Sequence, residues 1–233
     1  SDVYKRQERG LHSPAEVGDE ALLLADVAPT VKSRDRAAGA RLALAEGATA
    51  IVMDDGLQNP ALQKDLSLLV IDGGYGFGNG LLLPAGPLRE PVEVAAQRCH
   101  AAVLIGEDET GALARLPASM PVLRAHLVPD CAEPLGRRPV IAFAGIGRPE
   151  KFFRSVLSLG AELVAQHAYP DHHVYEARDA SALLAEAAYK GAKLVTTAKD
   201  FVKLPANLRA ACLVVQAHLA WEDEMALELL LSA

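Results

Sequence analysis

The chain has 233 residues, of which 51% are hydrophobic, 23% charged and 5% aromatic, and its formal net charge is −7. This length and composition predict a folded chain with a real core and exclude a disordered or low-complexity one. The negative charge argues against binding to nucleic acid, because duplex binding needs many cationic contacts to phosphate groups.

The first half of the chain alternates predicted strands and helices. Residues 1–7 fit neither pattern and are interpreted as a cloning or assembly scar. A glycine- and proline-rich stretch, Gly73–Pro91, predicts an ordered loop. The regular elements expected around it are a helix at Arg34–Glu46, strands at Ala50–Met53 and Ser67–Ile71, a helix at Val92–Arg98 and a strand at Ala101–Ile105. This alternation is typical of a parallel sheet.

The second half repeats the alternation after a stretch rich in proline and turn residues. In that stretch only Val122–Leu127 has a strand pattern. The elements expected beyond it are strands at Val140–Ala144, Glu162–Gln166 and Lys193–Thr197, and helices at Pro149–Leu159, Ala180–Tyr189 and Trp221–Leu231. We therefore expect an α/β fold with two lobes: a core at 8–120, a linker at 121–138 and a smaller lobe at 139–233.

Two properties bear on the cellular setting. No uninterrupted apolar stretch approaches the roughly 18 residues that a membrane-spanning helix needs. The three cysteines, Cys99, Cys131 and Cys212, lack metal-ligand spacing and are interpreted as inert thiols of a reducing compartment.

The most informative block is Asp54-Asp55-Gly56-Leu57-Gln58, which directly follows the apolar run Ala50–Met53. Carboxylates at the end of a parallel strand lie where ligands bind, and oxygen ligands of this kind suit Mg²⁺ in a phosphoryl-transfer site. The alternative is that the aspartates cap the helix or turn that follows.

Three further blocks allow both a functional and a structural interpretation. Val17–Glu20 could open a helix with favourable acidic residues. Asp171-His172-His173 could supply an oriented base or metal ligands, or could be surface histidines. Thr196–Asp200 resembles either an anion-binding edge or a helix cap. The sequence contains no Gly-x-x-x-x-Gly-Lys-Ser/Thr loop.

Taken together and in order, these blocks resemble the tetraacyldisaccharide 4′-kinase family, the lipid A kinases of Gram-negative bacteria. The blocks that carry the resemblance are Val17–Glu20, Asp54–Gln58, Gly76–Gly80, Leu83–Glu90, Ala144–Gly147, Asp171–His173 and Thr196–Asp200. The resemblance implies a first lobe with a P-loop NTPase-like parallel sheet that lacks its N-terminal P-loop segment. It also implies ATP and Mg²⁺, phosphorylation of a tetraacylated glucosamine disaccharide 1-phosphate to lipid IVA, and peripheral contact with the cytoplasmic face of the inner membrane.

The resemblance also implies roles for individual residues. Asp19 would be the acceptor base and His172 its partner, Asp55 would hold Mg²⁺, and Arg36 and Arg89 would bind phosphate. Further candidates are Asp54, Glu20 and Glu90 for the metal and Gln58 for the substrate or phosphate. Departures from the family pattern are Asn59, where histidine is common, and Ala198, where glutamate is common.

The resemblance further implies that this chain alone is inactive or nearly so, because the family's phosphate-binding loop and membrane-associating helix are not in its sequence. One alternative is a non-catalytic remnant that binds lipid or a partner. Another is a metal-dependent phosphoesterase, although no Asp-x-Asp pair occurs. The sequence leaves the oligomeric state open.

Overall fold

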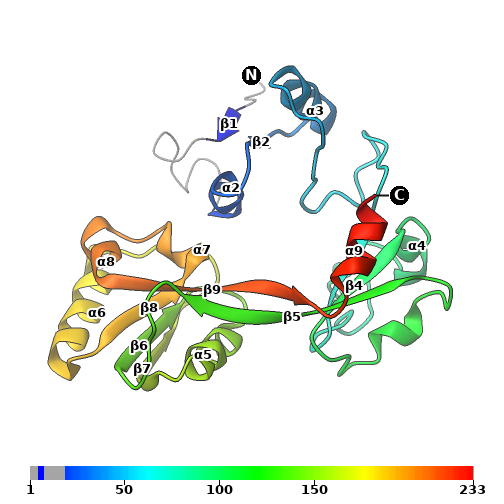
Figure 1. Cartoon of the computed structure of the whole chain (residues 1–233). Coiled ribbons are helices and arrows are strands. Elements are labelled where there is room, and N and C mark those ends of the chain that lie inside the picture. Colours follow the sequence, from blue (N-terminus) through cyan, green and yellow to red (C-terminus); the bar gives the residue numbers. More distant parts are fainter. Residues whose placement is uncertain (1–4, 8–18, 233) are drawn as a thin grey trace. The chain divides into compact units, whose positions relative to one another are not determined.

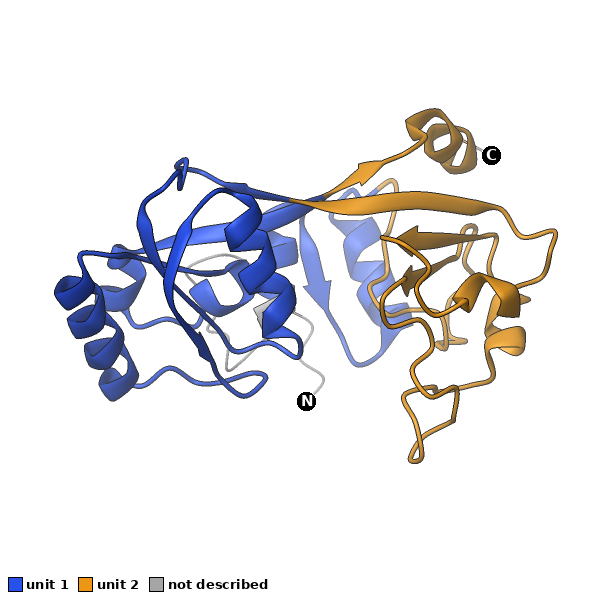
Figure 2. Ribbon diagram, turned by 90° about the horizontal axis from the view of Figure 1, so that it is seen from below, with its two compact units in different colours: residues 1–48, 129–218 blue, residues 49–128, 219–233 orange. Residues whose placement is uncertain are grey.

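The computed structural model describes residues 5–7 and 19–232, apart from the side chains of residues 5–7, 19 and 20. Contacts divide the chain into two compact units (Figure 2). Unit 1 comprises residues 1–48 and 129–218, and unit 2 comprises residues 49–128 and 219–233. None of the described helices is both long enough and apolar enough to cross a bilayer.

Unit 1 is built around four parallel strands. Its C-terminal portion holds β6 (Pro139–Ala144), α5 (Pro149–Ser158), β7 (Glu162–Ala168), α6 (Ala177–Lys190), β8 (Lys193–Thr197), α7 (Ala198–Phe201), α8 (Ala206–Ala211) and most of β9 (Cys212–Trp221) (Figure 1). Its N-terminal portion holds β1 (Lys5–Gln7), α2 (Asp19–Ala25), β2 (Thr30–Lys32) and α3 (Arg36–Ala45). The strand order is β9-β8-β6-β7, and each of these pairs is parallel.

The central strand β6 explains why unit 1 has a core on each side of its sheet. Successive side chains of a strand point to opposite faces, and every residue from Val140 to Ala144 is fully buried. Val140, Ala142 and Ala144 pack in one cluster with Phe153 and Val156 of α5. The opposite cluster joins Ile141 and Phe143 to buried residues that include Tyr175, Leu183 and Leu208.

Unit 2 contains three parallel strands in the order β3-β4-β5. Its elements are β3 (Leu68–Asp72), α4 (Val92–Ala96), β4 (Ala101–Ile105), the 3₁₀ helix η1 (Ala112–Arg115), most of β5 (Val122–Cys131) and α9 (Glu224–Leu231). Ile71 and Leu104 are adjacent in the register of β3 and β4 and form a buried cluster with Ala102 and Ala112. This sheet supports the long loop between β3 and α4.

The predicted strand at Ala50–Met53 is wrong. These residues take no regular structure, and the Val52 side chain is 96% exposed. No described strand pairs with them, so their backbone groups lack the ladder of hydrogen bonds that stabilises a strand.

The other predicted elements are confirmed with shifts of a few residues at their ends, with two larger differences. Val122–Leu127 extends to Cys131 as β5, and the C-terminal helix begins at Glu224 because Trp221 still belongs to β9. The sequence did not predict β9, α7 or α8. Lys5–Gln7 pair with Thr30–Lys32 as β1 and β2. The scar at 1–7 and the domain limits at 8–120, 121–138 and 139–233 stay predictions.

Candidate functional site

The Asp54–Gln58 block forms a turn in unit 2, which agrees with the turn interpretation of this block. Asn59 N–H donates to the Gly56 carbonyl at 3.1 Å, and Asp55 has a left-handed backbone with φ of 52°. The turn directs Asp55 Oδ2 to within 2.7 Å of Arg89 Nη2 in an exposed ion pair. The hydrogen bond and charge of Asp55 raise the pKa of Arg89, so this guanidinium stays charged.

A second polar link joins the same turn to Glu90. Gln58 Nε2 donates to Glu90 Oε1 at 2.9 Å, and Arg98 Nη2 forms an ion pair with the same oxygen. The Glu90 side chain is only 17% exposed. Neighbouring residues of one loop, Arg89 and Glu90, therefore bind two residues of the Asp54–Gln58 turn, Asp55 and Gln58.

A cavity of about 330 Å³ lies beside these contacts within unit 2. Asp55, Gln58, Arg89 and Glu90 form part of its lining together with apolar side chains such as Phe77. Cavities that combine an apolar lining with a few convergent polar groups are typical small-molecule sites.

The loop that carries Arg89 is ordered by Asn79. Its Nδ2 donates to the Ala85 carbonyl at 2.8 Å, and its Oδ1 accepts from Leu81 N–H at 3.1 Å. A Cβ atom at Gly86 would lie 2.1 Å from Asn79 Oδ1, so only glycine fits there. The expected ordered loop is thus confirmed.

The Asp171–His173 block forms a tight loop in unit 1 that separates the two histidines. His172 has a left-handed backbone with φ of 58°, and its ring is 61% exposed with Nε2 3.8 Å from Asp171 Oδ2. Its backbone N–H lies 3.0 Å from Asp171 Oδ1 and 3.2 Å from the Gly145 carbonyl oxygen. His172 therefore reaches solvent from a defined backbone position.

His173, in contrast, has a packing role. Its ring stacks on Tyr169 with centroids 4.6 Å apart and meets Tyr175 edge-on at 4.9 Å. Its Nε2 lies 3.1 Å from Asp179 Oδ2. Among the described residues, no three His, Cys, Asp or Glu side chains gather as a metal site. The interpretation of the two histidines as a ligand pair therefore gains no support.

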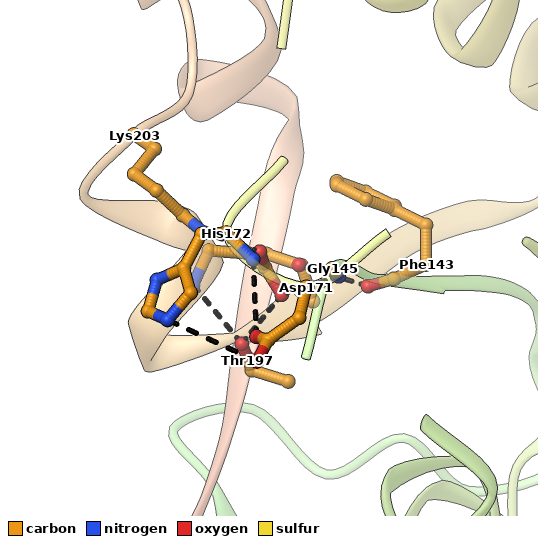
Figure 3. Close-up of polar contacts among 8 residues, drawn as sticks. Phe143, Gly145, Asp171, His172, Thr197 and Lys203 are labelled. Atoms are coloured by element: carbon orange, nitrogen blue, oxygen red, sulfur yellow. Dashed lines mark hydrogen bonds and ion pairs between the residues drawn. The ribbon is translucent and has the colours of Figure 1, made fainter. Parts of the chain in front are cut away.

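A buried polar cluster lies beneath this loop. Asp200 Oδ2 accepts from Gly145 N–H at 3.0 Å and from Thr197 Oγ1 at 2.8 Å (Figure 3). Lys203 Nζ lies 3.0 Å from Asp200 Oδ1. Thr197 Oγ1 also accepts from Asp200 N–H at 3.0 Å and so caps α7. The cap interpretation of Thr196–Asp200 therefore applies.

Tyr175 borders this cluster. Burial raises the pKa of its phenol far above the ordinary value, and the negative charge of Asp200 adds to the effect. The phenol therefore stays protonated at all physiological pH values.

The remaining predicted site residues lie at helix starts in unit 1. Asp19 and Glu20 begin α2, which lies beside α7, but their side chains are outside the described structure. Arg36 begins α3 after the cap Asp35, whose Oδ1 accepts from Ala38 N–H at 3.1 Å. In unit 2, Asp54 is an exposed neighbour of Asp55. The structure thus brings Asp55, Gln58, Arg89 and Glu90 together and does not test the pairing of Asp19 with His172.

Sequence reasoning missed Arg98, Lys203 and the burial of Asp200. The apolar residues around Asp200, from Leu194 to Leu204, were a usable signal, because an acid inside such a stretch is buried only with partners.

Comparisons with known proteins agree on one family. The model of LpxK, tetraacyldisaccharide-1-P 4′-kinase, matches residues 2–233. A tetraacyldisaccharide 4′-kinase of Gluconacetobacter diazotrophicus is 60% identical over 221 residues, which cover 94% of this chain and 68% of the relative. Its counterpart in Methylorubrum extorquens is 56% identical over 227 residues, covering 95% of this chain and 69% of the relative.

A solved structure matches as well. It is the "apo" form of LpxK from Aquifex aeolicus in complex with ATP, with a TM-score of 0.75 and 27% sequence identity. The match covers 100% of this chain and 74% of that chain.

Proposed function

Because the chain belongs to the tetraacyldisaccharide-1-phosphate 4′-kinase family, the ATP-dependent kinases of lipid A biosynthesis, we propose that its two site regions serve different parts of phosphoryl transfer. The turn and loop of unit 2 would bind the charged phosphates. The Asp171–His173 loop of unit 1 would act on the acceptor hydroxyl. The fold agrees with this family, since both units are mainly parallel α/β structures and the chain resembles an ATP-bound kinase.

One observation carries the proposal. Among residues 19–232, the only non-glycine residues with a positive φ are Asp55 and His172. Aspartate and histidine adopt a left-handed backbone more readily than most residues, but it is still uncommon for them, and such conformations concentrate at functional sites. The two strained residues also belong to two separate blocks of the family pattern.

In unit 2, Asp54 and Asp55 are the proposed residues for Mg²⁺, with Glu90 in support. Among the described residues, no three acidic or histidine side chains already gather as a metal site, so one or two carboxylates would hold Mg²⁺ while ATP phosphates and water supply the other oxygens. Bound Mg²⁺ would neutralise charge on the phosphates. Arg89 would clamp phosphate oxygens in a bidentate way, and Gln58 would keep Glu90 in position. We extend the phosphate-binding role to Arg36 and a supporting acidic role to Glu20.

In unit 1, Asp19 would accept the proton of the 4′-hydroxyl and His172 would hold and polarise Asp19. A sugar hydroxyl is a weak nucleophile at neutral pH, so a positioned base assists its attack. Support comes from the solvent-directed ring of His172 and from α2, the helix that begins with Asp19, lying beside α7.

The test is His172→Ala in the kinase expressed from its complete reading frame, with His173→Ala as the neighbouring control. Turnover should fall for His172→Ala far more than ATP affinity does, whereas His173→Ala should lower thermal stability first. Unchanged turnover in His172→Ala would remove this residue from the mechanism. The inactivity of the 233-residue chain alone stays a prediction, tested by measuring its turnover beside that of the Gluconacetobacter diazotrophicus relative.

We also propose peripheral contact with the cytoplasmic face of the inner membrane through the Leu81–Leu83 segment. These three consecutive leucines are 52%, 44% and 62% exposed, on the same loop as Arg89, and the substrate is acylated. Replacing Leu82 and Leu83 by serine should weaken cosedimentation with phosphatidylethanolamine–phosphatidylglycerol vesicles. Equal binding of both proteins would count against this segment.

A further inference from the structure

We propose that Asp200 is a positioning residue that fixes His172 through the backbone of Gly145, and this inference rests on the proposed role of His172. Gly145 N–H donates to Asp200 Oδ2 at 3.0 Å, and the Gly145 carbonyl accepts from His172 N–H at 3.2 Å. Two successive hydrogen bonds therefore join a buried carboxylate to the backbone of the exposed histidine. Figure 3 labels Gly145 and His172, the two backbone members of this relay.

The Asp200 carboxylate is itself held from several sides. It is fully buried, it accepts from Thr197 Oγ1 at 2.8 Å, and Lys203 Nζ lies 3.0 Å from its second oxygen. The Lys203 side chain is only 10% exposed. A buried charge is tolerated when it is paired and hydrogen-bonded, and such groups are rigid because every change of position breaks a bond that water cannot replace.

The space between Asp200 and the histidine loop is closely packed. A Cβ atom at Gly145 would lie 3.0 Å from His173 Cβ, 3.1 Å from the Pro170 oxygen and 3.2 Å from Asp200 Oδ1. A Cβ atom at Gly147 would find its nearest neighbour, Asp171 Oδ2, at an ordinary 3.7 Å. Because Gly145 has little space around it, a shift of the Asp200 carboxylate would displace the backbone at Gly145 and with it the histidine loop. Gly147, two residues further on, has room for a methyl group.

The strained backbone of His172 explains why such a support is needed. With φ of 58°, this residue would relax to a more favourable conformation if its surroundings did not hold it. The Gly145 carbonyl and Asp171 Oδ1 are the acceptors that its N–H meets. The aromatic packing of His173 and its hydrogen bond with Asp179 hold the far side of the loop. Asp200 thus fixes the direction in which the His172 ring leaves the protein.

The experiment is a double-mutant cycle with Asp200→Asn and His172→Ala in the kinase expressed from its complete reading frame. Asp200→Asn should lower kcat by about 10-fold or more with less than about a twofold change in KM for ATP. In the His172→Ala background, the same substitution should change kcat by less than about twofold, because the residue it positions is gone. Effects that multiply independently would overturn the inference. If His172→Ala alone leaves kcat unchanged, the proposed role of His172 fails instead.

Gly145→Ala and Gly147→Ala form a second, matched pair for the case in which Asp200→Asn does not fold. Gly145→Ala should reduce kcat in the wild-type background and add little to His172→Ala, whereas Gly147→Ala should keep kcat within about twofold of wild type. Circular dichroism confirms that each variant is folded. A folded Gly145→Ala enzyme with wild-type kcat would refute the relay.

Discussion

Replacing Arg89 by Gln should separate the activity of this kinase from its stability. The ion pair between Arg89 Nη2 and Asp55 Oδ2 is short, at 2.7 Å, but the two side chains are 53% and 62% exposed. Exposed pairs contribute about 0.2–1 kcal/mol to folding, because water screens the charges and both side chains lose freedom. The free energy of unfolding should therefore fall by about 1 kcal/mol or less.

The expected effect on catalysis is larger. A hydrogen bond to a charged group contributes about 1.5–3 kcal/mol, so loss of the guanidinium should lower kcat/KM for ATP by about 10- to 150-fold. Arg89→Lys should give an intermediate loss, because lysine keeps the charge without the planar fork that binds two oxygens.

The assays are ATP-dependent phosphorylation of the tetraacyldisaccharide 1-phosphate and urea unfolding. Arg138→Gln is the matched control, because Arg138 and Glu133 form another exposed ion pair, 3.8 Å apart, in unit 1. The reasoning is refuted if Arg89→Gln keeps wild-type kcat/KM. The reasoning is also refuted if Arg89→Gln loses much more stability than Arg138→Gln, enough to explain its lower activity.

Two further predictions follow from pKa shifts. Burial raises the pKa of Cys212 to about 12. At pH 8, iodoacetamide should therefore label this thiol at least about 100-fold more slowly in the native chain than in the chain unfolded by guanidinium, as measured by peptide mass spectrometry. Comparable labelling rates would contradict the burial of Cys212. A hydrogen bond from the Glu176 N–H, together with one from His173, holds the pKa of Asp179 below its ordinary 3.8. The contribution of ionised Asp179 to the free energy of unfolding is therefore present above about pH 4 and is lost as the pH falls through the lowered pKa. In urea titrations at several pH values, Asp179→Asn should therefore reduce the fall in the free energy of unfolding below pH 4. An unchanged fall would show that other groups cause the acid sensitivity.

The sequence predicted elements well where a local apolar pattern belongs to a segment that finds a pairing partner in the fold. The strands at Val140–Ala144 and Lys193–Thr197 pair as neighbours, with helices covering both faces. Ala50–Met53 has an equally apolar pattern but no described partner, and a local pattern carries no information on pairing.

For the candidate site as well, short segments were informative and long-range contacts could not be predicted. The ordered blocks identified the family, and they made Asp55, Arg89 and His172 candidate site residues, because these lie in short segments of distinctive composition. Their contacts could not be predicted, since Gln58 and Glu90 are 32 positions apart and Gly145 and Asp200 are 55 apart. Composition did not distinguish the two adjacent histidines, and only the family resemblance favoured His172. In the structure, the His172 side chain is 61% exposed, whereas His173 is 21% exposed and packs against tyrosines.

The division of the chain into two interleaved units constrains how it folds during synthesis. Each compact unit is assembled from two separate stretches, and the chain passes between the units after residues 48, 128 and 218. On the ribosome, the first stretch of unit 1 therefore waits for 80 intervening residues, 49–128, before its counterpart begins to emerge. Unit 2 is completed only by the last 15 residues, 219–233. Until residues 219–233 have been synthesised, the earlier stretch of unit 2 exposes unfinished surface, to which chaperones bind readily.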